Sequence, residues 1–191
     1  MRLTSIASVV VALVAAACTA EPNDAVPSND TATPNDTDTT VTQPDVDLNA
    51  LAIPYASTPL EGVLAAGQLS PAQMDALHAA GYRSFISLRV AEEKGAGWEE
   101  AHAADKDIRF VRLPVAGAAG IDEAHARQLG ELMDAEATPM VVYCGSSNRV
   151  GALFGLKAFH VDGMSAEEAF ALGKASGVTG LEPLFKQQLG L

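Results

Sequence analysis

A cysteine followed by a short polar loop and an arginine is the group of residues best suited to do chemistry in this sequence. Cys144 ends the apolar segment 140–143, and four small or amide-bearing residues separate it from Arg149, namely Gly145, Ser146, Ser147 and Asn148. Apolar residues recur at helical spacing after Arg149, which predicts a strand, a loop and a helix. Backbone N–H groups at such a helix start bind anions, and the helix dipole and the guanidinium both stabilise a thiolate. The sequence therefore predicts an anion site with a cysteine nucleophile, and a cysteine that is only a small buried side chain is the alternative.

Segments that favour strands and helices alternate on both sides of this loop. Four segments predict strands, at 63–68, 84–88, 109–113 and 140–143, and those at 84–88 and 140–143 are apolar. Helices are expected over 70–80, 92–104, 122–133 and 149–160, then after Ser165, and finally through Leu184 and Phe185. This alternation is typical of an α/β fold, so we expect residues 53–191 to form a single compact domain. Its sheet would be short and mostly parallel, with helices on both faces.

The first residues, 1–18, have the parts of an export signal. Arg2 precedes an apolar run over 6–17 that is too short to span a membrane, and Cys18 follows it directly. This order resembles a bacterial lipoprotein signal, in which the cysteine receives a lipid and becomes the mature N-terminus. We therefore expect a cell-envelope protein that a lipid on Cys18 anchors to the outer membrane, facing the periplasm. A cleaved signal without lipid, giving a periplasmic or secreted protein, is the alternative. Lipid on Cys18 would leave Cys144 without a disulfide partner.

The composition of the chain is uneven. Residues 19–52 are rich in Thr, Asp, Asn and Pro, which predicts a disordered acidic linker. The net charge of the chain is −12, but residues 21–50 contain seven acids and no base, so residues 51–191 have a net charge of −6. Without a cluster of Lys and Arg, nucleic-acid binding is not expected. No apolar stretch approaches the roughly 20 residues of a membrane-spanning helix, so the lipid would be the only membrane contact. The four histidines stand apart, and we expect neither a metal nor another cofactor.

Several segments together resemble one protein family. They are Gly-Gln-Leu-Ser-Pro at 67–71, Ile-Ser-Leu-Arg at 86–89, Leu-Pro-Val at 113–115 and the cysteine segment at 144–153. Over residues from about 58 to 180 the chain resembles the beta-lactamase-hydrolase-like, phosphatase-like domain family, which belongs to the superfamily of cysteine-dependent protein tyrosine and dual-specificity phosphatases. The resemblance implies a compact α/β fold with its active site at the carboxyl edge of a parallel sheet.

The resemblance also implies a mechanism for hydrolysis of phosphomonoesters, carried by small molecules or by phosphoproteins. Cys144 would attack the phosphorus and form a phosphocysteine, while Arg149 and the amides of 145–149 hold the phosphoryl oxygens. Asp122 follows a glycine-rich loop and is our candidate for the general acid, with a plain helix cap as the alternative. Arg89 is expected to add positive potential at the phosphate, or else to be the partner of a structural ion pair.

Three positions depart from conventional tyrosine phosphatases and keep other functions open. Tyr143 stands before the cysteine instead of histidine, the loop has four residues instead of five, and Val150 follows the arginine instead of a hydroxyl residue. Rhodanese-like sulfurtransferases, which carry a persulfide, have a cysteine loop with this shorter spacing that is often preceded by tyrosine. A third hypothesis is a tethered module that binds anionic ligands without turnover. The segments 67–71 and 86–89 favour the phosphatase.

Overall fold

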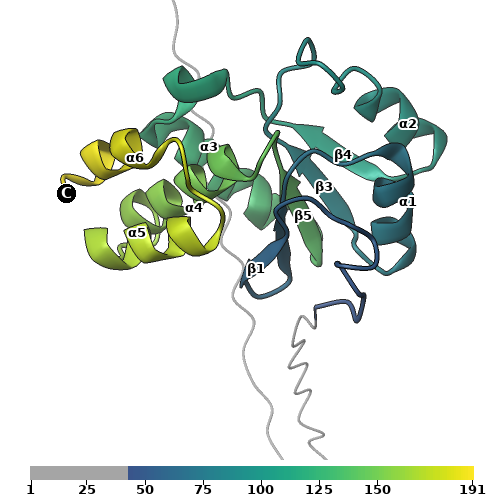
Figure 1. Cartoon of the computed structure of the whole chain (residues 1–191), viewed down its shortest axis with the longest axis horizontal. Helices are drawn as coiled ribbons and strands as arrows, with labels where there is room; N and C mark the ends of the chain where they lie inside the picture. Colours follow the sequence, from purple (N-terminus) through teal and green to yellow (C-terminus); the bar gives the residue numbers. More distant parts are fainter. Residues whose placement is uncertain (1–42) are drawn as a thin grey trace, which may run out of the picture. The chain divides into compact units, whose positions relative to one another are not determined.

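The computed structural model describes residues 43–191 (Figure 1). The expected export signal, with Cys18, and the linker up to position 42 lie outside the described residues. The last residues assigned to the linker, 43–52, lie on the domain, because three apolar side chains from this segment pack against its core: Val46, Leu48 and Leu51. The packed domain therefore includes residues that precede the expected boundary at position 53.

The sheet has five strands in the order β1-β2-β5-β3-β4. Their bounds are β1 (Ser57–Leu60), β2 (Val63–Ala66), β3 (Ser84–Ser87), β4 (Arg109–Arg112) and β5 (Met140–Tyr143). The last four are parallel, and β1, which the sequence did not lead us to expect, pairs with β2 antiparallel. Every residue of β2, β3 and β5 is buried, because helices cover both faces of a parallel sheet. The expected α/β fold with a mostly parallel sheet is confirmed.

The helices form two layers, one on each face of the sheet (Figure 1). Their bounds are α1 (Pro71–Ala79), α2 (Glu99–Asp105), α3 (Glu123–Ala135), α4 (Asn148–His160), α5 (Ala166–Ala175) and α6 (Glu182–Leu189). Helices α1 and α2 pack on one face through Met74, Leu77 and Ala103, and the other four enclose a larger core around α4. No helix within residues 43–191 is both long enough and apolar enough to cross a membrane.

Three helices begin at the expected capping residues, and the start of α2 differs from the expectation. The side chains of Ser70, Asp122 and Ser165 accept hydrogen bonds from the first turns of α1, α3 and α5. The expected helix over 92–104 was wrong in its first half, because residues 88–98 form a loop and α2 begins only at Glu99. Gly95 in this loop has a φ of +82°, a conformation that does not continue a helix.

The strand register brings four loops together at one edge of the sheet. Tyr143, the last residue of β5, lies opposite Ala66 of β2 and Ser87 of β3, and Ser87 lies opposite Arg112 of β4. Since these are the carboxyl ends of parallel strands, the loops that follow them start side by side. The cysteine loop therefore begins in the middle of this edge, between the loops that follow β2 and β3.

Helix α4, which starts in the cysteine loop, is fixed by close backbone packing. Gly151 faces α5 so closely that a Cβ atom there would lie 2.5 Å from the carbonyl oxygen of Gly173. One turn later, a Cβ atom on Gly155 would overlap the ring of Phe185 from α6. Only glycine allows these approaches, so the rotation of α4, and with it the direction of its first turn, is set by the C-terminal helices.

Candidate active site

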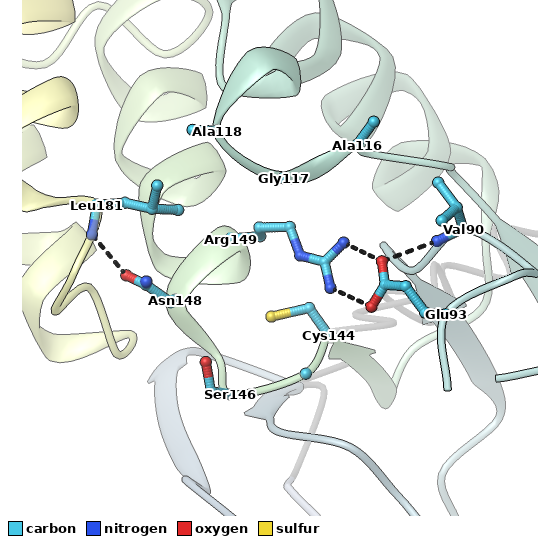
Figure 2. A pocket seen from close by; sticks show the side chains of 11 residues that line it. Val90, Glu93, Ala116, Gly117, Ala118, Cys144, Ser146, Asn148, Arg149 and Leu181 are labelled. Atoms are coloured by element: carbon cyan, nitrogen blue, oxygen red, sulfur yellow. Dashed lines mark hydrogen bonds and ion pairs between the residues drawn. The ribbon is translucent and has the colours of Figure 1, made fainter. Parts of the chain in front are cut away.

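A cavity of about 480 Å³ opens at the carboxyl edge of the sheet, over the cysteine loop. Its floor is formed by Cys144, Gly145, Ser146, Asn148 and Arg149. The loop after β3 contributes Val90 and Glu93, and the loop after β4 contributes three small residues, Ala116, Gly117 and Ala118. Figure 2 shows these small residues on the opposite side of the cavity from Cys144 and Ser146. The cavity is thus built by the loops that the strand register brings together.

The cysteine loop leaves the first turn of α4 without a side-chain cap. Ser147 has a left-handed conformation, with a φ of +57°, and its hydroxyl donates to the carbonyl oxygen of Ser176 at 2.8 Å instead of accepting from α4. The first N–H groups of a helix have no acceptor within the helix, so here they are available to a ligand beside Cys144. The Cys144 sulfur lies inside the curve of this loop (Figure 2), and the residue as a whole is 1 % exposed.

Asn148 ties the cysteine loop to the segment before α6. Its side-chain oxygen accepts hydrogen bonds from the backbone of Thr179 at 2.9 Å and of Leu181 at 3.3 Å. The Leu181 side chain thereby becomes part of the cavity wall (Figure 2). The expected phosphate-binding residues Gly145, Ser146 and Asn148 therefore line the cavity. The Ser147 side chain is buried and points to the carbonyl oxygen of Ser176, so it stabilises the conformation of the loop.

The Arg149 guanidinium crosses the cavity beside Cys144 and is held from one side. Its Nη1 donates to the carbonyl oxygens of Leu88 at 3.2 Å and Val115 at 2.7 Å, and to Glu93 Oε1 at 2.5 Å. Its Nη2 donates to Glu93 Oε2 at 2.7 Å. No described residue accepts a hydrogen bond from Nε, so this edge of the guanidinium can bind a ligand. Glu93, with a further contribution from the nearby Cys144, raises the pKa of Arg149 above its ordinary value.

Glu93 is the functional residue that sequence reasoning missed. Both of its carboxylate oxygens accept N–H donors: Oε1 from Arg149 and from the backbone of Val90 at 3.1 Å, Oε2 from Arg149 and from Arg89 Nε at 3.4 Å. These donors, Arg149 first, lower the pKa of Glu93 to about 2. Its place in the sequence could have indicated this role, since Glu93 lies in the loop after a buried strand whose end meets the cysteine loop. The expected helix over 92–104 placed Glu93 in a helix instead of in that loop.

Comparison with solved structures identifies the fold. A candidate phosphatase from Neisseria meningitidis matches with a TM-score of 0.59 and 19 % sequence identity, covering 70 % of this chain and 96 % of its own. A candidate phosphatase from Shewanella putrefaciens matches with a TM-score of 0.58 and 14 % identity, covering 75 % and 97 %. The core catalytic domain of the PP-IP phosphatase Siw14 from S. cerevisiae, in complex with citrate, matches with a TM-score of 0.52 and 13 % identity, covering 72 % and 86 %. This chain has the cysteine phosphatase fold. No protein-family model matches the sequence, and no curated protein matches it.

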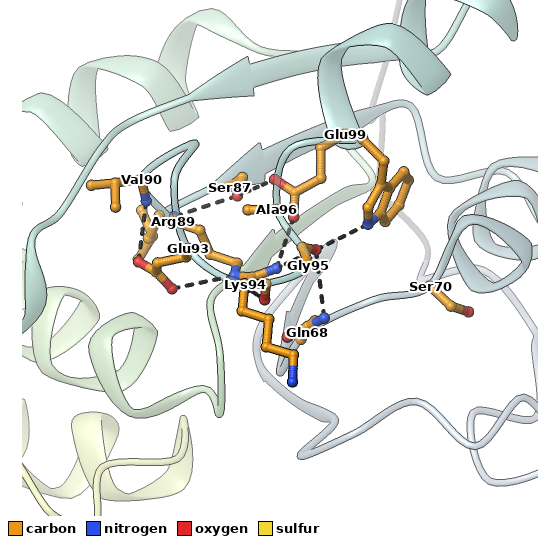
Figure 3. Close-up of polar contacts among 12 residues, drawn as sticks. Gln68, Ser70, Ser87, Arg89, Val90, Glu93, Lys94, Gly95, Ala96 and Glu99 are labelled. Carbon is orange, nitrogen blue, oxygen red and sulfur yellow. Dashed lines mark hydrogen bonds and ion pairs between the residues drawn. The ribbon is translucent and has the colours of Figure 1, made fainter.

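Within this cysteine phosphatase fold, Arg89 does not reach the cavity. The side chain is 2 % exposed, and its Nη atoms donate to the carbonyl oxygens of Lys94 at 2.7 Å and Gly95 at 2.8 Å (Figure 3). Arg89 Nη1 also lies 3.2 Å from Glu99 Oε1. Of the two roles considered for Arg89, the structure shows the structural ion pair, and the guanidinium shapes the loop that carries Glu93.

Glu99 is the centre of this buried ion-pair network. Its side chain is fully buried and accepts hydrogen bonds from the Ser87 hydroxyl at 2.9 Å and from Arg89, and it lies 3.0 Å from Nη2 of Arg112. Arg112 in turn donates to the carbonyl oxygens of Arg89 and Ala96. Burial raises the pKa of Glu99, while Ser87 and the two arginines oppose that shift. The loop over 88–98, which has no regular structure, is thus held by two arginines around one carboxylate.

Asp122, our candidate for the general acid, lies outside the cavity lining of this phosphatase fold. Its carboxylate caps α3, accepting from the backbone N–H of His125 at 2.8 Å and lying 2.8 Å from the His125 ring nitrogen Nδ1. These contacts, the backbone one first, lower the pKa of Asp122. The structure therefore shows the cap. The glycine-rich loop does reach over the site, but it brings Ala116 to Ala118 there.

Among residues 43–191, no group of three or more His, Cys, Asp or Glu is placed to hold a metal ion.

The ion pair between Glu93 and Arg149 predicts a pH-dependent stability difference. Because the pKa of Glu93 is about 2 in the folded chain, against an ordinary value of 4.5, its stabilising effect is present above pH 4.5 and is lost as the pH falls through 2. Glu93→Gln is expected to lower the free energy of unfolding at pH 7 by about 2 kcal/mol, and this difference should shrink at pH 3. Urea unfolding at both pH values measures it, with the exposed neighbour change Glu92→Gln as the control. If the loss of unfolding free energy in Glu93→Gln is the same at pH 7 and pH 3, the ion pair does not lower the pKa of Glu93 in the way described.

Proposed function

We propose that the domain is a phosphatase that hydrolyses phosphomonoesters through a phosphocysteine intermediate on Cys144. The observation that carries this proposal is the arrangement of Cys144 and Arg149 in one cavity. The guanidinium is fixed by Glu93 and two carbonyl oxygens, and its Nε edge remains unpaired among the described residues. The uncapped first turn of α4 adds N–H donors on the same floor. An anion bound there has donors on two sides and a sulfur nucleophile beneath it.

The first chemical step follows from this placement. The Cys144 thiolate attacks the phosphorus, the S–P bond forms, and the P–O bond to the leaving group breaks. Arg149 and the α4 amides bind the phosphoryl oxygens while negative charge redistributes over them. Glu93 keeps the guanidinium in place before the substrate arrives, so little reorganisation is needed during the reaction.

In the second step, hydrolysis of the phosphocysteine, fewer side chains are placed to assist the reaction. The sulfur must leave as a thiolate, and in conventional tyrosine phosphatases a hydroxyl residue after the arginine assists it. Val150 stands at this position and is fully buried. Its side chain has no donor, so we expect dephosphorylation of the enzyme to limit turnover. An initial burst of leaving group in stopped-flow measurements would show this step directly.

A two-part assay on the full chain tests the proposed function. One part measures phosphate release from 4-nitrophenyl phosphate, and the other measures sulfur transfer from thiosulfate to cyanide, which a persulfide carrier would perform. Each part is repeated with Cys144→Ser, because turnover that does not need Cys144 belongs to another site. We expect thiol-dependent phosphate release only. Thiol-dependent thiocyanate formation would show that the protein is a sulfurtransferase. If neither product forms, the domain is better explained as an anion-binding module.

We also propose that the domain acts in the cell envelope, held to the outer membrane by a lipid on Cys18. The support is the order of Arg2, the apolar run 6–17 and Cys18, together with the acidic linker that follows. The expected substrate is then a phosphorylated small molecule or protein that reaches the periplasm. Cell fractionation tests the anchor, since Cys18→Ser should move the protein from the membrane fraction to the soluble fraction. An unchanged distribution would refute the lipid anchor.

A further inference from the structure

Two carboxyl groups are candidates for the proton donor, Glu93 in the cavity lining and Asp122 after the glycine-rich loop, and both are engaged as hydrogen-bond acceptors. Glu93 is the carboxylate that lines the cavity, and each of its oxygens accepts from two N–H donors. A proton on either oxygen would meet donors only, so this geometry keeps Glu93 ionised. Asp122 accepts from the backbone of His125 and lies beside its ring, outside the cavity lining. Neither carboxyl holds a proton that it can give to a substrate.

The side of the cavity that faces Cys144 consists of small residues without an ionisable group. Ala116, Gly117 and Ala118 occupy this position (Figure 2), on the short 3₁₀ segment Gly117–Gly120 and the residue before it. In the first step of the proposed reaction, the leaving oxygen departs on the side of the phosphorus opposite the attacking sulfur, because the displacement is in line. The leaving group is therefore directed toward methyl groups and backbone.

We propose that the leaving group departs from this site without receiving a proton, so that the substrates are phosphate esters of acidic hydroxyls, such as aryl or enol phosphates. This inference rests on the proposed function and narrows its substrate class. The Cys144 thiolate forms the S–P bond, the P–O bond breaks, and both electrons of that bond stay on the leaving oxygen. The resulting phenolate or enolate takes its proton from water after it has left. Only a stable oxyanion leaves fast enough by this route, whereas alkyl phosphates require an acid.

The walls of the cavity fit such a leaving group. Val90 and Leu181 border the cavity with apolar side chains, and Ala116 and Ala118 add only methyl groups to its lining. Arg149 is the one basic residue in the cavity lining, and Glu93 balances its charge. A single phosphoryl group on an uncharged ring therefore finds its partners here, and a second phosphate would have no cation among the lining residues.

The experiment is a leaving-group series of substituted phenyl phosphates assayed with the full chain. Values of kcat/KM report the first irreversible step, so they depend on the leaving group even if hydrolysis of the phosphocysteine limits kcat. A general acid contributes about 10² to 10⁴-fold to such a step. We expect kcat/KM to fall by about 10²-fold or more from 4-nitrophenyl to unsubstituted phenyl phosphate, because nothing compensates the more basic leaving oxygen.

Two variants show whether a hidden acid is present. Glu93→Gln should change kcat/KM for all members of the series by a common factor, and Asp122→Asn should leave the dependence on the leaving group as it is in the wild type. A nearly flat series in the wild type, or a series that becomes steeper in either variant, reveals a proton donor and overturns the proposal. Absence of any Cys144-dependent release from 4-nitrophenyl phosphate would instead overturn the proposed function and this inference together.

Discussion

Substitution of Cys144 by serine is expected to lower kcat/KM for an aryl phosphate by about 10⁴-fold or more, because a hydroxyl in this site is not ionised and cannot form the phosphoenzyme. The nucleophile is the one group in the proposed mechanism that no neighbour can replace. Phosphate release from 4-nitrophenyl phosphate measures the loss. The variant keeps Arg149 and the α4 amides, so it should still bind inorganic phosphate, which isothermal titration can detect.

The serine variant also tests whether the change is confined to chemistry. Cys144 is 1 % exposed and belongs to the larger core cluster, but serine differs from it by a single atom. Its unfolding midpoint in urea should therefore remain close to that of the wild type. Full activity in a variant that is folded and binds phosphate would remove Cys144 from the mechanism. If Cys144→Ser loses both its activity and its fold, the same measurements are made on Cys144→Ala, which introduces no polar group.

Glu99→Ala is expected to lower the free energy of unfolding by about 3 to 5 kcal/mol, the usual effect of removing one partner from a buried ion pair. The side chain of Glu99 is fully buried between Arg89 and Arg112, which are 2 % and 12 % exposed. Without the carboxylate, two guanidinium groups would face each other in the interior. Chemical denaturation with urea measures the difference, and the linear dependence of the free energy on urea gives its size.

A neighbouring residue provides the matched control for Glu99. Glu100 also pairs with Arg112, but its side chain is 50 % exposed. Exposed ion pairs contribute about 0 to 1 kcal/mol, so Glu100→Ala should have a small effect. Similar losses for the two variants would show that burial of the network contributes little. A large loss for Glu99 alone also predicts weaker activity, because the loop that carries Glu93 is built on this network.

The parts of the fold that depend on local patterns were predicted from the sequence. Short, largely apolar runs predicted β2, β3 and β5, since a strand buried on both faces needs few polar residues. The edge strand β4 was also predicted, although it carries Arg109 and Arg112 and is not buried. The helix starts at Ser70, Asp122 and Ser165 were recognisable because a capping side chain acts within three residues. Likewise, Cys144 and Arg149 are five positions apart, and their proximity follows from a strand, a turn and a helix.

The parts of the site that depend on distant partners were not predictable in this way. Glu93 meets Arg149 across 56 positions of sequence, and no local pattern marks a carboxylate that will bind a particular guanidinium. Arg89, at the end of its strand, has the same local context whether it faces the cavity or the interior. Its orientation is decided by Glu99, a residue that looks like any acid in a first helical turn. The partners of these charged side chains are therefore known only once the three-dimensional structure is known.

The contacts of the cysteine loop with the segment that precedes α6 have a consequence for biosynthesis. Ser147 donates to the backbone of Ser176, and Asn148 accepts from the backbone of Thr179 and Leu181. A ribosome that has completed α4 has therefore produced the cysteine but not the residues that give its loop a final shape. The thiol becomes part of an organised site only when nearly the whole polypeptide has emerged, so we expect an incomplete chain to have no hydrolytic activity on phosphate esters.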